Sequence, residues 1–137
     1  QAAVAMAKSA YTIYQDVFHG KDFGALHAAG GRPQYLLWAS TSTKNPAYSD
    51  LLYVEPLMGP QTINTLPDDT LVKLRDHGSL VARVEDDMAG ARRTMAQLAS
   101  LGIDMDGAVA EQLQVEGLAA FAKSFEEMLA EVGRAMR

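Results

Sequence analysis

The chain has 137 residues, of which 48% are hydrophobic and 21% are charged, values close to those of ordinary globular domains. This length suits one domain rather than two with independent cores. Seventeen acidic residues against twelve basic ones give a net charge of −5, and this balance, without a basic run, disfavours binding to nucleic acid. No apolar stretch approaches the roughly 20 residues that cross a bilayer, so we expect no membrane partner.

Cysteine is absent from the sequence, which excludes disulfides, thiolate metal sites and a cysteine nucleophile. This composition fits a reducing compartment such as the cytoplasm. The first residues, Gln1 to Val4, lack an initiator Met and the basic segment of a signal peptide, and they already follow a helical pattern. We therefore expect the chain to be part of a longer polypeptide.

The N-terminal part of the sequence predicts two helices and then a strand. Apolar residues at helical spacing predict a helix over residues 2–18 that Gly20 ends. A shorter helix is expected over residues 21–29. Residues 35–39 are a short, continuous apolar run between turn residues, which is typical of a strand buried on both faces of a parallel sheet.

The middle of the sequence predicts a second strand with a helix on either side of it. Residues 51–58 are expected to form a short helix that Pro56 interrupts, and residues 62–65 a brief strand. Pro67 suits the first position of a helix that reaches His77. The order of strand, helix, strand and helix is that of a βαβα unit with parallel strands.

The remainder of the sequence is predicted to be helical. Acidic residues at 86–87 are expected to begin one helix, which Gly102 ends, and those at 104–106 to begin another. Gly117 is expected to loosen the chain there. A long amphipathic face follows over residues 118–132.

Two parallel strands are too few for a stable sheet, because three or more are normally needed. The apolar run at residues 35–39 predicts neighbouring strands on both sides. We therefore predict an α/β fold in which the chain is the C-terminal part of a (β/α)8 TIM barrel: its last two strands with the flanking and C-terminal helices. A small α+β domain with a minimal sheet is the alternative from the pattern alone.

The loop that follows the first predicted strand has the composition of a phosphate-binding site. It carries four hydroxyls, an ammonium group and an amide, from Ser40, Thr41, Ser42, Thr43, Lys44 and Asn45. Hydroxyls and backbone N–H groups donate to phosphate oxygens, while a lysine neutralises charge. In barrels, phosphate sites often follow the last two strands. A simple polar turn has a similar composition, so the loop alone leaves both interpretations open.

The sequence contains no recognisable acid–base or metal-binding constellation. The histidines at 19, 27 and 77 are expected to be solvated or to cap helices, and His77 with Gly78 predicts a helix C-terminus. The acidic clusters precede helices and are expected to be N-caps. No lysine lies at the end of a predicted strand. We therefore predict no catalytic residue, metal or cofactor within this chain.

Several motifs in order resemble those of bacterial transaldolases. They are WASTSTKNPAYSD at 38–50, LYVE at 52–55, TINTLP at 62–67, DHG at 76–78 and LGID at 101–104. The resemblance covers nearly the whole chain. It is closest to the long transaldolase subfamily of actinobacteria and cyanobacteria, some members of which are fused to a phosphoglucose isomerase.

The resemblance implies a cytoplasmic enzyme of the class I aldolase type that needs no cofactor. Such an enzyme uses a Schiff-base lysine to move a dihydroxyacetone unit between ketose and aldose phosphates of the pentose phosphate pathway. The implied substrates are fructose 6-phosphate, sedoheptulose 7-phosphate, erythrose 4-phosphate and glyceraldehyde 3-phosphate.

The resemblance places the lysine and the proton-transferring acids on earlier strands. Residues 1–137 are then the C-terminal segment of one barrel domain, with the N-terminal part of the same protein as partner, and are expected to be inactive alone. The phosphate anchor of the family matches Ser40 and Lys44, with Thr41, Ser42 and Asn45 beside them. Many transaldolases have arginine in a shorter loop at the position of Lys44, and lysine binds phosphate as a point charge rather than as a fork.

A function of another class is also compatible with the sequence. Long amphipathic faces such as residues 118–132 would suit a non-catalytic helical module that binds a protein partner. A module should fold cooperatively as a monomer, whereas a piece of a barrel should self-associate or be partly molten.

Overall fold

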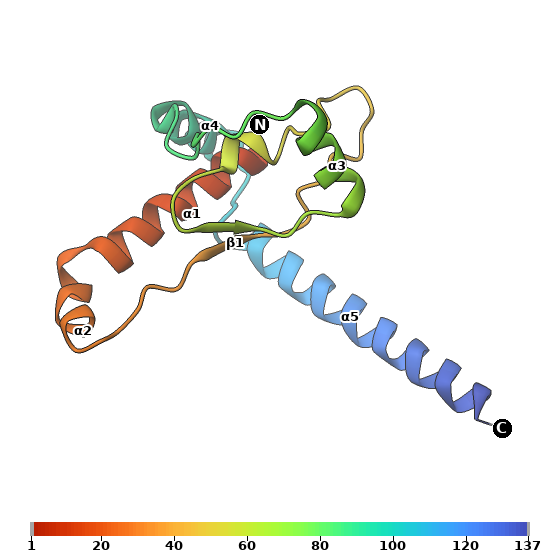
Figure 1. Ribbon diagram of the computed structural model, residues 1–137. Coiled ribbons are helices and arrows are strands. Elements are labelled where there is room, and N and C mark those ends of the chain that lie inside the picture. Colours follow the sequence, from red (N-terminus) through yellow and green to blue (C-terminus); the bar gives the residue numbers. More distant parts are fainter. Residues whose placement is uncertain (1, 137) are drawn as a thin grey trace. The chain divides into compact units, whose positions relative to one another are not determined.

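The computed structural model describes residues 2–136, and the chain divides into two compact units, Gln1–Met95 and Ala96–Arg137. Its elements, shown in Figure 1, are α1 (Ala2–His19), η1 (Lys21–Phe23), α2 (Gly24–Ala28), β1 (Leu36–Trp38), η2 (Glu55–Leu57), β2 (Thr62–Asn64), α3 (Asp68–His77), α4 (Met88–Ser100) and α5 (Ala108–Ala135). The described part of the chain is therefore rich in helix, with two short strands.

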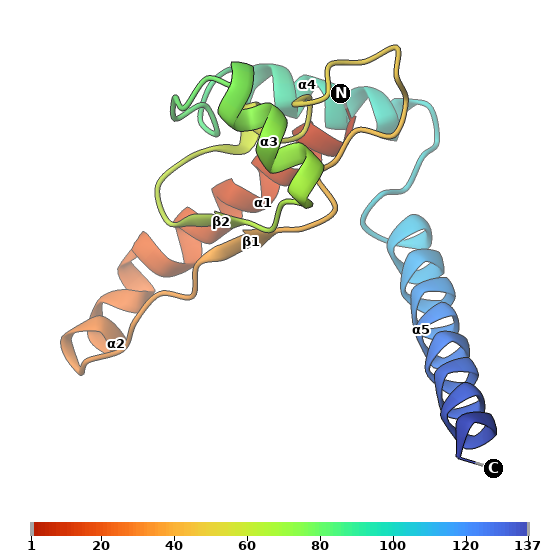
Figure 2. The same ribbon diagram turned by 45° about the vertical axis from the view of Figure 1, so that its right-hand side comes forward.

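The two strands lie side by side and run parallel, as predicted (Figure 2). Their register joins Leu36 to Thr62, Leu37 to Ile63 and Trp38 to Asn64. Beyond the last pair, the backbone N–H of Thr65 donates to the carbonyl of Trp38 at 3.0 Å. Each strand is shorter than predicted, so the predicted strands at 35–39 and 62–65 are right in position and too long.

The connection between the strands is not the helix predicted over residues 51–58. Residues 51–54 form turns, and only the short 3₁₀ helix η2 follows them. Pro56 lies within η2, where it lacks a backbone N–H and its ring obstructs an α-helix on its N-terminal side. The βαβα prediction is therefore right in strand direction and wrong in its first helix.

The other helices of the first unit follow the predicted boundaries closely. α1 ends just before Gly20, and α3 lies between Pro67 and Gly78. The helix predicted over residues 21–29 is divided into η1 and α2, and Gly30 follows with a φ of 92°, a conformation that glycine adopts without strain. Local signals thus set most of these boundaries.

The core of the first unit lies between α1 and β1. Tyr11, Tyr14 and Val84 form its buried cluster, against which Leu36 and Trp38 pack from the strand. Tyr11 and Tyr14 are three residues apart on α1, so both point to the same side of the helix. Burying these side chains is what holds α1 against one face of the strand pair.

Polar groups of α1 fix the turn that precedes β2. The hydroxyl of Tyr14 donates to Oε1 of Gln61 at 2.5 Å, and that of Tyr11 to the carbonyl of Pro60 at 3.4 Å. The carbonyl of Gln61 in turn accepts from the backbone N–H of Leu36 at 3.2 Å. Burial is the main reason why the pKa of Tyr14 is raised. These bonds set where β2 begins relative to β1.

The second face of the strand pair is open, contrary to the prediction that the first strand is buried on both faces. Leu37 is 56% exposed and its partner Ile63 is 47% exposed. Successive strand residues point to opposite faces, and within residues 2–136 only the face toward α1 is covered. An apolar pattern on both faces is therefore present without its second layer.

Lys8 of α1 is buried, with only 7% of its surface exposed. Its ammonium group donates to the carbonyls of Arg83 at 3.1 Å and Asp86 at 2.5 Å. A buried charge is costly unless it is hydrogen-bonded, and these two carbonyls meet that need. Lys8 thereby ties α1 to the segment that delivers Val84 to the core.

In the second unit, a glycine ends α4 and a carboxylate begins α5, both as predicted. Gly102 has a φ of 77°, and the N–H of Ile103 donates to the carbonyl of Leu98 at 3.1 Å, as in a Schellman C-cap. Asp104 accepts from the N–H groups of Ala108 and Gly107 at 3.1 and 3.0 Å. These bonds lower the pKa of Asp104.

α5 is one continuous helix, so the prediction that Gly117 loosens the chain is wrong. Glycine within a helix costs about 1 kcal/mol relative to alanine, and the many alanines around Gly117 outweigh it. Within this unit the amphipathic face of α5 is exposed, with Leu118 at 75% and Phe121 at 80%.

We expect Gly59→Ala to destabilise the fold by about 1–3 kcal/mol, because the new methyl group overpacks the core. A Cβ at Gly59 would meet Cγ1 of Val84 and lie 3.0 Å from its Cβ, and Val84 is only 1% exposed. Urea unfolding followed by the fluorescence of Trp38, the single tryptophan, measures the change.

Gly24→Ala is the matched control, since a Cβ at this helical position meets nothing within 4 Å. We expect it to be neutral or stabilising by up to about 1 kcal/mol. Equal effects of the two substitutions would show that Gly59 is not packed against Val84 as described.

Candidate functional site

The carboxyl ends of β1 and β2 meet at one edge, and the loop after β1 is fixed there. Thr41 is buried, and its hydroxyl donates to Oδ1 of Asn64 at 2.8 Å. The hydroxyl of Thr65 donates to the carbonyl of Trp38 at 3.2 Å. The segment after each strand is therefore bonded to the last residue of the other strand, at the edge where ligands bind in parallel α/β folds.

Ser40, near the start of this loop, has an unusual backbone conformation. It is exposed and has a φ of 58°, in the left-handed region that residues other than glycine seldom adopt. Such a conformation costs roughly 1–3 kcal/mol and is most common at functional sites. Backbone strain is thus found at Ser40, a residue that was predicted from the sequence to bind phosphate.

The remaining predicted residues lie on the same loop but differ in their availability. Lys44 and Asn45 are exposed and Ser42 is half-buried. Oδ1 of Asn45 accepts from the N–H of Ala47 at 2.9 Å, which closes a local turn. The hydroxyl proton of Thr41 is used by Asn64. Ser40 and Lys44 therefore offer an exposed hydroxyl and an exposed cation.

A second contact, which was not predicted from the sequence, holds the far end of the loop. Nε2 of His77 lies 3.1 Å from Oδ1 of Asp50, and its Nδ1 lies 3.1 Å from Oδ2 of Asp76. Nζ of Lys73 lies 4.0 Å from Oδ2 of Asp50. His77 ends α3 next to Gly78, as predicted, and it also joins α3 to the loop.

This contact shifts the pKa values of both partners. The hydrogen bond to Asp50, then that to Asp76, raises the pKa of His77 above its usual value. The same bond from His77 lowers the pKa of Asp50. Both side chains are partly exposed to solvent, so water screens their attraction.

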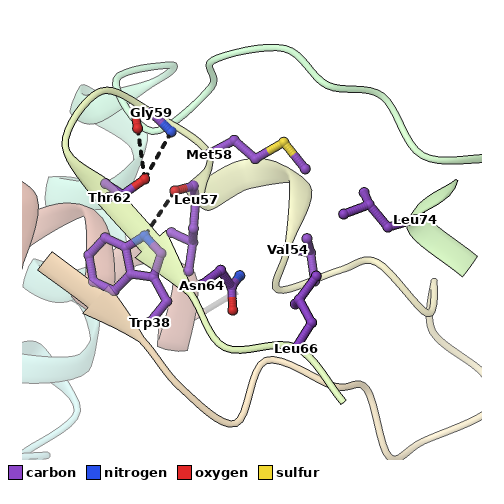
Figure 3. Close-up of a pocket in the computed structure, with 9 residues that line it drawn as sticks. All are labelled: Trp38, Val54, Leu57, Met58, Gly59, Thr62, Asn64, Leu66 and Leu74. Atoms are coloured by element: carbon purple, nitrogen blue, oxygen red, sulfur yellow. Dashed lines mark hydrogen bonds between the residues drawn. The ribbon is translucent and has the colours of Figure 1, made fainter. Parts of the chain in front are cut away.

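A separate pocket of about 230 Å³ lies between the strands, η2 and α3 (Figure 3). Two of its polar groups are already paired: Nε1 of Trp38 donates to the carbonyl oxygen of Leu57 at 2.9 Å, and the hydroxyl of Thr62 donates to the carbonyl oxygen of Gly59 at 2.7 Å. Neither Ser40 nor Lys44 lines it. The lining residues are Trp38, Val54, Leu57, Met58, Gly59, Thr62, Asn64, Leu66 and Leu74. With no charged group, this pocket is unsuited to a phosphate.

Residues 2–136 show neither a metal site nor a membrane-spanning helix. No group of three histidine, aspartate or glutamate side chains there could hold a metal ion. None of the helices in that range combines the length and the apolar character needed to span a membrane.

α/β proteins bind ligands where parallel strands end, and this structure has a strained polar loop at that edge. The sequence model of the transaldolase/fructose-6-phosphate aldolase family matches residues 1–132. The chain belongs to this family, and the resemblance seen in its motifs is confirmed.

Curated relatives named transaldolase support the same assignment. The chain is 55% identical to that of Thiobacillus denitrificans over 133 residues, which are 97% of this chain and 37% of the relative. It is 45% identical to that of Neisseria gonorrhoeae over 130 residues, 95% of this chain and 37% of the relative. It is 43% identical to that of Mycolicibacterium smegmatis over 130 residues, which are 94% of this chain and 35% of the relative. The chain thus spans little more than a third of these relatives.

We expect His77 to titrate above 6.5, its ordinary pKa, and Asp50→Asn to bring that pKa down toward 6.5. Because the folded pKa of His77 is raised, the stabilisation by this contact is complete below pH 6.5, as long as Asp50 stays ionised, and is lost as pH rises through the raised value. A ¹H NMR titration of the imidazole protons measures the pKa.

Asp76→Asn serves as the comparison and should lower this pKa less, since Asp50 is the larger cause. A pKa of His77 that is the same with and without the Asp50 carboxylate would contradict the contact.

Proposed function

We propose that this chain supplies the last two strands and the following helices of a transaldolase (β/α)8 barrel, in which residues 40–45 bind the phosphate of the sugar substrate. One observation carries the proposal: Ser40 and Lys44 leave the carboxyl end of β1 on a loop that Thr41 anchors to the end of β2. In barrels this edge carries the active site.

The open surfaces of the first unit support a barrel that other polypeptide completes. β1 pairs with β2 on one side, and within the described residues its other edge has no strand. Beside β1 lies an apolar groove of about 560 Å³. Its lining comes from α1 and the strand: Ala10, Ile13, Tyr14, Val17, Phe18, Gln34, Tyr35, Leu36 and Leu37. We assign this groove, with Leu37 and Ile63, to contact with the N-terminal part of the barrel.

The proposed chemistry is the transfer of a dihydroxyacetone unit from a ketose phosphate to an aldose phosphate through a Schiff base. We assign the lysine and the acids to the N-terminal part, and the reaction to the pentose phosphate pathway in the cytoplasm. Fructose 6-phosphate, sedoheptulose 7-phosphate, erythrose 4-phosphate and glyceraldehyde 3-phosphate are the substrates.

The role of this chain is to hold the phosphate that lies far from the bond that breaks. Ser40 donates a hydrogen bond to a phosphate oxygen, and Lys44 supplies a positive charge beside it. Energy from a remote phosphate is used to orient the reacting carbon atoms. The left-handed backbone at Ser40 sets the direction in which the loop leaves β1.

The family match favours this reading over that of a separate helical module. It extends to residue 132 and so includes most of α5. The exposed apolar face of α5 therefore belongs to the sequence of the enzyme family rather than to an appended binding domain.

The barrel proposal is tested by trapping the Schiff base. The test compares the chain alone with a chimera in which this chain replaces the segment it matches in the T. denitrificans transaldolase. With fructose 6-phosphate and borohydride, we expect a covalent adduct on the chimera and none on the chain alone, measured by mass spectrometry. An adduct on the isolated chain would refute the assignment of the lysine, and a folded but inactive chimera would refute the barrel role.

The phosphate site is tested by Lys44→Ala in the same chimera. Loss of a charged hydrogen bond, worth about 1.5–3 kcal/mol, should raise KM for fructose 6-phosphate about 10- to 100-fold. Reaction with unphosphorylated fructose should be unchanged. Steady-state kinetics measure both.

Lys123→Ala provides the control. This lysine is exposed on α5, and within the described residues its one ion pair is with Glu127 at 3.8 Å. It should leave both substrates unaffected. Equal losses with phosphorylated and unphosphorylated sugar in Lys44→Ala would rule out a phosphate role.

A further inference from the structure

The DHG motif at residues 76–78 has no role in the function proposed so far, yet its histidine contacts the proposed phosphate loop. His77 lies at the end of α3, and its Nε2 reaches Oδ1 of Asp50 at 3.1 Å. The backbone carbonyl of Asp50 also accepts from the hydroxyl of Thr43 at 3.5 Å. The loop is therefore held at its start by Thr41 and Asn64 and at its end by Asp50 and His77.

We propose that Asp50 and His77 are positioning residues that hold the loop carrying Ser40 and Lys44, and that sugar-phosphate affinity falls when His77 loses its proton. This inference rests on the proposed function of the loop. Neither residue is assigned a contact with the substrate. Both act through the position of the loop.

The chemistry of imidazole explains why the proton matters. His77 has a carboxylate at each ring nitrogen, Asp50 at Nε2 and Asp76 at Nδ1, both at 3.1 Å. The imidazolium ion donates to both at once, whereas neutral imidazole carries one N–H and can serve only one of them. Loss of the proton also removes the charge attraction. Asp76 then competes with Asp50 for the remaining N–H group.

The other charges nearby limit the size of the effect. Lys73 lies 4.0 Å from Asp50 and still attracts it when His77 is neutral. The carboxylate of Glu55 accepts from the backbone N–H of Ser79 at 2.8 Å, which holds the chain just after His77. We therefore expect the loop to loosen rather than detach. A change in affinity of about two- to tenfold follows, the range for one hydrogen bond.

The experiment measures KM for fructose 6-phosphate from pH 5.5 to 8.5 in the chimera and in its His77→Gln variant. The substrate phosphate also titrates near pH 6, but its effect is common to both proteins and cancels in the ratio of their KM values. We expect that ratio to show His77→Gln weaker by about two- to tenfold at low pH and equal at high pH. kcat should change less than KM.

Two further variants separate positioning from a general structural role. Asp50→Asn should weaken binding at low pH as His77→Gln does, whereas Asp76→Asn should keep tight binding at low pH because the contact with Asp50 remains. His77→Arg, with a charge that persists at every pH tested, should hold KM low at pH 8.5. Thermal unfolding of each variant checks that it is folded.

The outcomes distinguish this inference from the function on which it rests. A KM ratio that does not vary with pH, or Asp50→Asn binding like the parent chimera, overturns the positioning role while Lys44→Ala still raises KM. If Lys44→Ala leaves KM unchanged, the phosphate loop itself is wrong, and this inference is overturned with it.

Discussion

The parallel pairing of β1 with β2 is the constraint on which the rest of the site depends. Because the strands run in the same direction, both chains leave them at one edge, and Thr41 can reach Asn64 there. An antiparallel pair would send the loop and the residues after β2 to opposite ends. The buried tyrosines of α1 stabilise this pairing from one face and fix the turn that begins β2. The position of Ser40 and Lys44 follows from these contacts.

Local signals in the sequence predicted the features that local physics decides. Gly102 ends α4 through its positive φ, and Asp104 begins α5 by accepting two backbone N–H groups. Prediction failed where several weak preferences compete. Gly117 was overruled by the strong helix formers beside it, and Pro56 reduced a predicted helix to a short 3₁₀ turn. The strand directions and the loop at their carboxyl ends were predicted correctly.

The contact between Asp50 and His77 could not be predicted, because the two residues are 27 positions apart and meet only through the fold. His77 next to Gly78 has the pattern of an ordinary helix C-terminus. That pattern accounts for the histidine by itself, so nothing in the sequence pointed to a contact with Asp50. For the faces of β1, in contrast, the sequence pattern predicted more packing than this chain supplies. Its apolar pattern predicted two covered faces, and the chain by itself supplies one.

In the proposed phosphate site, the left-handed backbone at Ser40 would place stability and binding in opposition at one residue. Glycine would relieve the local strain there but would remove the hydroxyl, so a sequence selected only for thermal resistance would drift toward glycine at this position. If Ser40 has the proposed role, engineering for robustness at this position would come at the expense of substrate recognition.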